Sequence, residues 1–471
     1  MRILKKALAF LFAAAIPTAS LAQTDTSAIL LPPGVPPLPD PIEGVLRGMV
    51  IGPSNASFYK EILPPEFFEG VLGKKAYIDA ASKVEVLPEF DQDWIAGTQE
   101  FVEVDKKFSK DDSLIFNFPL KRGALFGSGD LISKEWRGIL DTASSLESSD
   151  LTLTALKRRE RESALARKIL WNTNSVFWSQ GLIDFHFRTL WLSKGHATRN
   201  VRGRYTRAYP KFLDHDFGYP QLFREKLSFY YPTAIDGLGW LSFRFEDFEE
   251  DILWAYSPAI QKVRELTSTN RSDSLVTSSL AIDDFLGWSN NLNFFKSRVV
   301  GKSQLLTPFP SLRPLKLEPT SGCFKLGSAQ GELGSFWNFE NQKFKGGYDW
   351  LPAKAIFIPR ELYQIELAPT DPYYLAGREE LYVDAETFLP YYKFVYDRSG
   401  RLWKAEMFGW FFAKSVDGIR QIPVPGFQVV IDLIAKRELV LDFSRFRSCR
   451  EYPADISLKD FDPKNLIPSA N

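Results

Sequence analysis

The sequence predicts a mainly β protein whose strands form one large antiparallel sheet, either open or curled into a barrel. The first observation is an alternation in residues 240–246, where Leu241, Phe243 and Phe245 are separated by polar residues, as in a half-buried strand. The second is an aromatic content of 14%, with 39 Phe, 17 Tyr and 12 Trp, which is enough for a large core, an apolar cavity or a binding face.

Residues 240–266 are the clearest strand-rich stretch. After the first strand, a second extended run at 252–256 ends at Ser257-Pro258, because proline lacks the N–H that a continuing strand needs. One side of these strands is aromatic, and Ser242, Arg244 and Glu246 are expected on the opposite, wet side. The alternation does not decide whether the aromatic side packs in a core or lines a ligand cavity.

Further strands are predicted on both sides of this stretch. Residues 182–192 alternate apolar and polar side chains, and 199–209 form the partner strand, with Arg202, Arg204 and Arg207 expected on the wet face. The C-terminal strands are predicted at 378–384, 391–396, 402–408, 428–433 and 438–443. Residues 397–400 read as a turn, with Gly400 suited to positive φ. Residues 153–172 are rich in Leu, Ala, Lys, Arg and Glu and predict a helix.

The aromatic side chains of the predicted strands are the candidates for a ligand-facing apolar wall. They are Trp240, Phe243, Phe245, Trp254, Tyr256, Phe185, Phe187, Trp191 and Trp403.

The N-terminus indicates export. Basic residues precede an apolar run at 7–16 that is too short to span a bilayer, and Ser20-Leu21-Ala22 offers a cleavage site, so residues 1–22 are predicted to be a signal peptide. Residues 23–44 are a Pro-rich tether. Residues 45–471 are predicted to form a single large domain with an insertion at 311–348, exported to the periplasm and without a transmembrane segment in the mature chain.

Composition limits the partners. Lys plus Arg and Asp plus Glu are 58 each, and a net charge of zero argues against a nucleic-acid binder. Cys323 and Cys449 are the two cysteines, and in an oxidising compartment they can pair, although the sequence does not say whether they meet.

Motifs of familiar enzymes are missing, since the chain has no Gly-x-Ser-x-Gly elbow and no phosphate-binding Walker loop. Asp283, Asp284 and His215 are the polar residues that an envelope hydrolase could use, although a capping role is the commoner one for such an Asp pair. No cofactor or metal site is predicted, because adjacent residues such as Asp214-His215-Asp216 rarely converge on one ion.

A series of short motifs resembles one family. Residues 253–259, Val263-Arg264, Asp283-Asp284, 300–302, 378–384 and 396–403 follow one another in an order that is similar to the DUF1329 family of exported proteobacterial proteins, relatives of the outer-membrane lipoprotein-sorting (LolA/LolB-like) proteins. The motif residues, structural or functional, are Pro258, Arg264, Asp283, Asp284, Gly301, Arg378, Tyr382, Asp384, Tyr396, Asp397 and Gly400.

The resemblance implies an α+β fold in which a large curved antiparallel sheet forms an unclosed barrel, with helices packed on or in its concave side. It also implies a carrier or chaperone in the periplasm or peripheral to the outer membrane, which binds lipid, lipoprotein acyl chains or another apolar ligand. An RND-type transporter or an outer-membrane component is the partner that the resemblance implies. The helix at 153–172 is the expected lid. A hydrolase and a non-catalytic structural subunit of an export complex are the alternatives.

Overall fold

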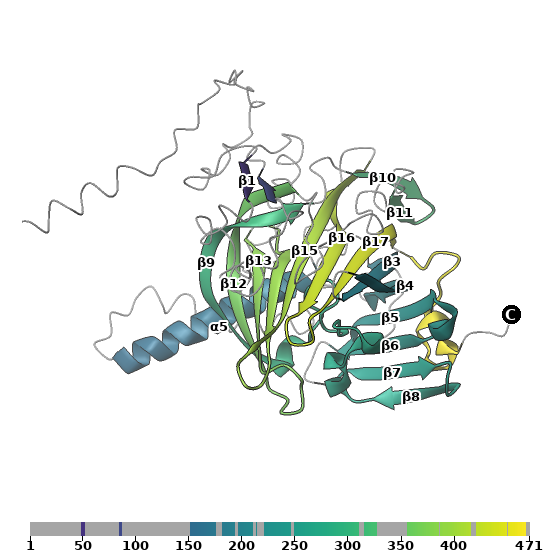
Figure 1. Ribbon diagram of the computed structural model, residues 1–471, viewed down its shortest axis with the longest axis horizontal. Helices are drawn as coiled ribbons and strands as arrows, with labels where there is room; N and C mark the ends of the chain where they lie inside the picture. The colour runs from purple at the N-terminus through teal and green to yellow at the C-terminus, as the bar shows by residue number, and fades with distance from the viewer. Residues whose placement is uncertain are drawn as a thin grey trace, which may run out of the picture. The chain divides into compact units, whose positions relative to one another are not determined.

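The computed structural model describes residues 49–51, 84–86, 151–175, 181–193, 196–210, 213, 221–245, 249–309, 315–326, 356–385, 387–415, 421–449 and 451–467 (Figure 1). The predicted signal peptide, the tether and His215 lie outside the described residues, as does most of the predicted insertion at 311–348. Among the described residues, no helix is both long enough and apolar enough to cross a membrane.

Two meanders build the sheet, and each strand in them pairs antiparallel with the next. The first meander contains β3 (Leu182–Ser193), β4 (His196–Ala208), β5 (Gln221–Tyr231), β6 (Gly239–Phe245), β7 (Ile252–Ser257) and β8 (Lys262–Leu266). The second contains β12 (Ile356–Pro369), β13 (Arg378–Asp384), β14 (Pro390–Tyr396), β15 (Leu402–Ser415), β16 (Gln421–Asp432) and β17 (Arg437–Cys449).

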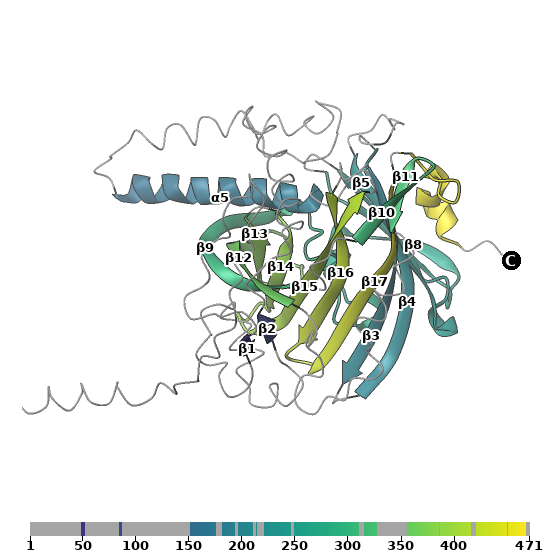
Figure 2. The ribbon, with the colours of Figure 1, turned by 90° about the horizontal axis from the view of Figure 1, so that it is seen from above.

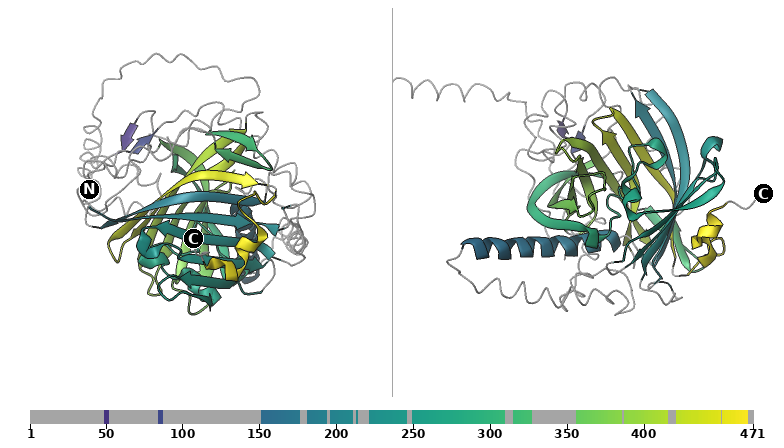
Figure 3. Two further views of the ribbon diagram at one scale, coloured as in Figure 1. Left: turned by 90° about the vertical axis from the view of Figure 1, so that its right-hand side faces the viewer. Right: turned by 90° about the horizontal axis from the view of Figure 1, so that it is seen from below.

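Strand β17 pairs with β3 and joins the two meanders, and β9 (Phe295–Phe309) adds to the free edge of β12. The order is therefore β8 through β3, then β17 through β12, then β9. Figure 3 shows the strong curvature of this sheet. Among the described strands, the residue pairings of β8 are with β7 and those of β9 are with β12, so the two ends of the sheet are not joined to each other by them. The prediction of a curved, unclosed antiparallel sheet is confirmed.

Four short strands attach to this sheet. The hairpin of β10 (Leu315–Thr320) and β11 (Cys323–Leu326) pairs with β15 and β17, and a disulfide joins Cys323 to the directly opposite Cys449. Strands β1 (Met49–Ile51) and β2 (Val84–Val86) pair with each other, and β2 runs parallel to the start of β12.

The connection from β8 to β9 crosses the concave face. It contains the 3-10 turns η5 (Ser268–Ser272), η6 (Leu275–Thr277) and η7 (Leu292–Phe294). All residues from 278 to 292 are buried, and we call this segment the plug. It contacts β4 through Ser289 and Arg207 and contacts β14 through Asp284 and Lys393. These strands belong to different arms of the sheet, so the plug must lie on the concave side.

The long helix α5 (Leu151–Ser175) is confirmed at the predicted position. Residues 158–160 of this helix are exposed, an i,i+4 ion pair joins Arg158 to Glu162, and Figure 2 shows the helix extending beyond the sheet. Its C-terminal half is in the core, where Ile169 and Leu170 are buried. Arg167 donates to the carbonyl of Leu292 at 3.1 Å, which brings the helix to the end of the plug.

Both faces of the sheet are covered over much of its area. Every residue of β14 is buried. On the outer face of β6 and β7, Leu241 and Tyr256 pack with Phe461 and Leu466 of the C-terminal turns η9 (Leu458–Phe461) and η10 (Pro463–Leu466), which Figure 1 shows in yellow beside these strands. The remaining turn, η4 (Thr233–Ile235), connects β5 to β6. The sheet therefore has no simple division into an apolar and a wet face.

Candidate functional site

An aromatic cluster lies where the plug meets β3, β4 and β17. Phe285 of the plug stacks on Tyr205 with ring centroids 4.8 Å apart and contacts Phe187 edge to face at 5.6 Å. Phe185 and Phe443 complete the cluster and contact each other at 5.3 Å. The plug therefore covers an aromatic concave wall that would otherwise face a cavity.

Three buried arginines surround the second half of the plug. Arg207 of β4, Arg244 of β6 and Arg271 of η5 are each at most 2% exposed. The carbonyl oxygen of Ser289 accepts hydrogen bonds from Arg244 and Arg271, and the Ser289 hydroxyl contacts Arg207. These bonds tie the plug backbone to the sheet.

Three buried carboxylates balance the three arginines. Glu225 accepts from Arg207 at 2.8 Å and from Arg271 at 2.9 Å. Burial alone would raise the pKa of Glu225, but the arginines outweigh burial and hold that pKa well below its usual range. Asp251 pairs with Arg244, and Asp283 accepts from Arg271 at 2.6 Å and from the hydroxyl of Tyr374 at 3.0 Å.

A second buried cluster surrounds Asp284. Lys393 of β14 and Lys404 of β15 donate to its two oxygens at 2.7 and 2.9 Å. Burial opposes the ionisation of Asp284, but the two ammonium groups outweigh it and lower its pKa. Glu406 lies in the same cluster, where burial and the charge of Asp284 raise its pKa well above the usual value.

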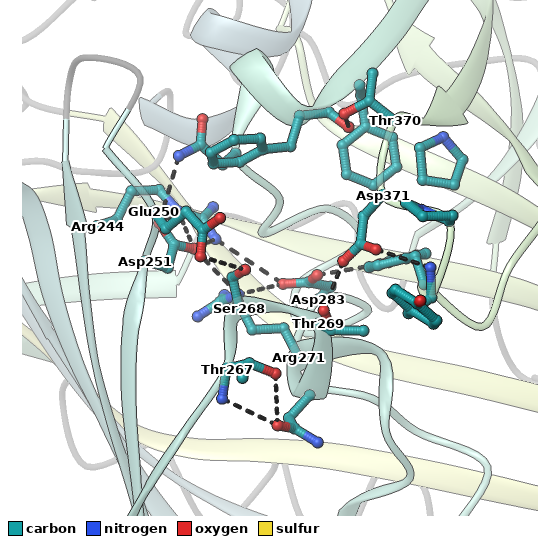
Figure 4. Close-up of a pocket in the computed structure, with 18 residues that line it drawn as sticks. Arg244, Glu250, Asp251, Thr267, Ser268, Thr269, Arg271, Asp283, Thr370 and Asp371 are labelled. Atoms are coloured by element: carbon teal, nitrogen blue, oxygen red, sulfur yellow. Dashed lines mark hydrogen bonds and ion pairs between the residues drawn. The ribbon is translucent and has the colours of Figure 1, made fainter.

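A pocket of about 620 Å³ opens where the two ends of the sheet approach each other (Figure 4). Residues 267–271 line one side and residues 369–374 line the other, with Asp251 and Asp283 at the base. Contacts cross this gap from Thr269 to Asp371 at 2.5 Å and from the Leu375 amide to Ser272 at 3.2 Å. We call it the seam pocket.

The predicted apolar wall is divided between the two faces of the sheet. Phe185, Phe187, Trp191 and Trp240 lie on the concave face, because strand register places them with Tyr205 and Ser242. Phe243, Phe245, Trp254 and Tyr256 lie on the outer face, where Phe243 and Trp254 contact each other at 5.0 Å and pack against the cluster of the C-terminal turns. Trp403 lies in a register irregularity of β15, and its ring is 4.6 Å from Nζ of Lys404, which binds the plug, so Trp403 packs against the concave core.

The expected wet faces are wrong for several polar residues. Ser242 and Arg244 are 1% exposed and lie on the concave side. Arg207, also expected in water, is equally buried, Arg204 is half-buried and Arg202 is exposed. Glu246 lies outside the described residues. The charges are buried because the plug brings carboxylates and carbonyls to them, as a buried charge requires.

The two candidate catalytic aspartates do not converge on one pocket. Asp283 lines the seam pocket and both of its oxygens have partners, whereas Asp284 faces the lysine cluster. Asp284 also accepts from the amide of Ala281 at 3.1 Å, the kind of nearby backbone bond that the sequence favoured, whereas Asp283 is bound by the side chains of Arg271 and Tyr374.

The remaining motif residues have structural surroundings. Asp397 accepts from the amides of Ser399 and Arg401, and Gly400 has φ of 81°, so the predicted turn is confirmed. Pro258 follows Ser257, whose carbonyl closes the β7–β8 turn. Arg264 is exposed and pairs with no described carboxylate, and Gly301 lies opposite Gln364 in the sheet. Arg378 pairs with Glu366 and Glu380 and lies over the ring of Tyr396. Tyr382 is buried, and Asp384 pairs with Arg360.

Sequence reasoning missed the plug itself and its partners Glu225, Arg271, Lys393 and Lys404. Each of these charged residues reads locally as solvent-facing. The available signal for their burial was the recurrence of charged residues next to aromatic residues within the same strands.

Residues 163–466 match the model of a protein family described as "Protein of unknown function (DUF1329)". The chain belongs to the DUF1329 family. The matched range begins in α5 and includes the plug, the seam pocket and both buried charge clusters. A comparison with curated proteins finds no match.

Solved structures give distant likenesses to this DUF1329 chain. A DUF1329 family protein from Desulfovibrio piger is 15% identical, covering 66% of this chain and 99% of its own, with a TM-score of 0.43. A putative outer membrane lipoprotein-sorting protein domain from Vibrio parahaemolyticus is 15% identical over 64% and 99%, with a TM-score of 0.42. A LolA superfamily protein from Nitrosomonas europaea is 16% identical over 63% and 97%, with a TM-score of 0.37.

Proposed function

We propose that this protein is an exported carrier that holds an apolar ligand, such as a lipid or a lipoprotein acyl chain, on the concave face after the plug moves aside. The observation on which this rests is the contact of Phe285 with the aromatic concave wall of Phe185, Phe187, Tyr205 and Phe443. A removable segment, rather than a paired strand, separates this wall from solvent.

The backbone of the plug and of the turn η6 directly before it favours displacement. Val276, Thr277 and Leu286 have φ of 51°, 63° and 57°, a left-handed conformation that β-branched and large side chains rarely adopt. Each such residue stores about 1–3 kcal/mol of strain, which the surrounding contacts must offset. Strained residues of this kind concentrate in switch segments, and release of this strain would lower the free energy of opening.

The apolar burial that the plug loses on opening and the apolar burial that a ligand gains are of the same order. Six large apolar side chains of the plug are buried, namely Leu280, Ile282, Phe285, Leu286, Trp288 and Leu292. At about 1.5–3 kcal/mol each, their burial contributes roughly 9–18 kcal/mol. An acyl chain of about 14 carbons gains at most about 11 kcal/mol at ~0.8 kcal/mol per CH₂. A ligand therefore replaces much of the apolar burial that the plug loses, which suits a carrier that must both load and release.

The seam pocket is the proposed entrance. It lies at the open edge of the sheet. The hydrogen bonds described across it involve side chains, from Thr269 to Asp371 and from the Leu375 amide to the Ser272 hydroxyl, and not a ladder of backbone bonds. Tyr373 at its rim is 79% exposed, which places an aromatic ring where an apolar ligand would first make contact. Helix α5 contacts the plug end at Leu292 and is proposed to move with it.

The periplasmic location follows from the predicted signal peptide, and the RND-type transporter stays a prediction from the family resemblance. The structural-subunit alternative needs no movement of the plug. It therefore predicts no saturable binding of an apolar ligand.

Two matched variants test the carrier. Phe185 on the concave face and Phe461 on the outer face are both fully buried phenylalanines, so Phe185→Ala and Phe461→Ala should each lose about 3–5 kcal/mol of stability. The mature protein and both variants are titrated with a fluorescent fatty acid, and each affinity is corrected for the fraction of protein that is folded. Phe185→Ala should change the affinity for the fatty acid, and Phe461→Ala should not. Mass spectrometry of an organic extract should also detect co-purified lipid. Failure of both measurements on the unmodified protein would remove the proposal.

A further inference from the structure

A second pocket, of about 450 Å³, lies on the outer face of the sheet. Its floor is formed by β3, β4 and β17, and the β10–β11 hairpin forms its other wall. Asp184 and His186 of β3 line it, whereas their neighbours Phe185 and Phe187 point to the concave face. This outer pocket is therefore separate from the plug and from the seam pocket.

Basic side chains dominate the outer pocket. Its lining contains the four cationic residues Arg204, Lys325, Arg445 and Arg447 and the three carboxylates Asp184, Glu318 and Asp455. Burial lowers the pKa of His186, and the nearby arginines add to this effect while Asp184 opposes it. With a neutral imidazole, the four cations and three carboxylates that line the pocket sum to a net charge of one positive.

Two of the arginines are held in fixed positions. Arg204 and Arg447 donate to the two oxygens of the buried Asp184 at 2.7 and 2.8 Å. Both also bind Asp455, at 3.2 and 2.6 Å. Their guanidinium groups are thus oriented by the protein before any ligand arrives, which reduces the entropy that binding would lose.

The other two cations have no such partner. The side chains of Lys325 and Arg445 are exposed and form no hydrogen bond or ion pair with the described residues, although Glu318 lies directly opposite Lys325 in the pairing of β10 with β11. Lys325 lies directly opposite Arg447 in the antiparallel pairing of β11 with β17, and like charges in that position destabilise a sheet. An anion between them would remove this repulsion.

The backbone at Arg445 is strained. Its φ is 51°, and it lies in the register irregularity between Ser444 and Arg447 where β17 pairs with β3. Irregularities of this kind redirect side chains and occur beside binding sites. Here the strain places an arginine at a pocket that already contains an excess of positive charge.

We propose that the outer pocket binds the phosphate group of a phosphorylated ligand. Arginine forks match the oxygens of a phosphate, and its two negative charges would compensate Lys325 and Arg445 together. The volume is within the range of small-ligand sites. The same chemistry is presented by the head group of an anionic lipid and by a free phosphorylated compound.

Calorimetric titration of the full mature protein with inorganic phosphate and with glycerol phosphate tests the site. Arg445→Gln and Lys325→Gln each remove one unpaired cation, and Arg264→Gln and Lys262→Gln remove the same charge from the exposed strand β8. Loss of one charge-assisted hydrogen bond should weaken phosphate binding about tenfold in the two pocket variants. The two β8 variants should match the unmodified protein.

Vesicle flotation separates the two sources of phosphate. If the ligand is a lipid head group, the protein should float with phosphatidylcholine vesicles that contain phosphatidic acid, and the Arg445→Gln variant should not. Binding of soluble phosphate without flotation identifies a free ligand. No phosphate binding at all, or equal loss in the β8 variants, overturns the proposal. Phe185→Ala should leave phosphate affinity unchanged, so failure of the carrier proposal is distinguishable from failure of this one.

Discussion

The carboxylate of Asp284 in the plug accepts a hydrogen bond from Nζ of Lys393 at 2.7 Å, and Lys393 is fully buried. Lys404 donates to the other oxygen of the same carboxylate. One plug residue therefore binds two ammonium groups of the sheet, and Glu379 of β13 lies 3.2 Å from the same Nζ of Lys393. Seating of the plug and stability of the sheet are coupled at this point.

Asp284→Asn should destabilise the protein by about 3–5 kcal/mol, because it leaves two buried ammonium groups without their main counter-charge. Urea denaturation at neutral pH measures this loss. Asp371→Asn is the control, since it removes one described hydrogen bond at the seam and should lose about 1 kcal/mol. Equal stability of the two variants would show that the Asp284 cluster does not hold the plug.

The Asp284 cluster also predicts a pH dependence. Because the folded-state pKa of Asp284 is lowered, its stabilising effect is present above the ordinary value of 3.8 and is lost as the pH falls. The unmodified protein should therefore lose more stability than Asp284→Asn on acidification below about pH 4.

Gly287→Ala tests the close fit of the plug. Gly287 has φ of 91°, and an added Cβ would lie 2.5 Å from Cγ of Pro390. Gly400 has φ of 81° with nothing within 4 Å of the added atom. Gly400→Ala should cost about 1 kcal/mol from backbone strain alone, and Gly287→Ala should cost about 1–3 kcal/mol more from the clash. Similar melting temperatures for the two variants would contradict the packing described here.

Asp442→Asn should change how stability depends on pH. Burial raises the pKa of Asp442 to about 7 against the opposing charge of Arg188. The proton on Asp442 thus stabilises the fold fully below the ordinary pKa of 3.8, and this effect is lost as the pH rises through about 7. At pH 8 the variant should be more stable than the unmodified protein by up to about 4 kcal/mol, with no such gain at pH 4.

Denaturation curves from pH 4 to pH 8 measure the Asp442 effect. Glu361→Gln is the control, since Glu361 is exposed and its surface pair with Lys302 contributes at most about 1 kcal/mol. A parallel pH profile for Asp442→Asn and the unmodified protein would rule out the predicted proton.

The disulfide should be a major stabilising link. Cys323 and Cys449 are 126 residues apart, and closing so long a loop in the unfolded chain is worth about 3–5 kcal/mol. The Cys323→Ser/Cys449→Ser double variant should lose that amount of unfolding free energy. A reducing agent should lower the stability of the unmodified protein to that of the double variant and should leave the double variant unchanged. An unchanged midpoint on reduction would mean that the bond is absent in solution.

Local patterns were sufficient to predict many of the strands, although β5 was not among them. Alternation at 182–192 and 241–245 corresponds to β3 and β6, and Pro258 marks the end of β7. These features follow from side-chain periodicity and backbone chemistry within a few residues, which the sequence displays directly.

Burial could not be predicted in the same way. Arg244 is buried because residues of the plug more than 30 positions along the chain reach it, as the contact with Ser289 shows. Phe243 lies on the outer face because the C-terminal turns cover that side. Both outcomes depend on long-range contacts, and alternation specifies only that two faces exist, without specifying what covers each.

Amide hydrogen exchange of the plug, with and without a saturating fatty acid, tests the central claim most directly. The carrier account predicts that ligand increases exchange at residues 278–292 while β3 and β4 keep their protection. Saturable ligand binding with unchanged exchange of the plug would contradict it.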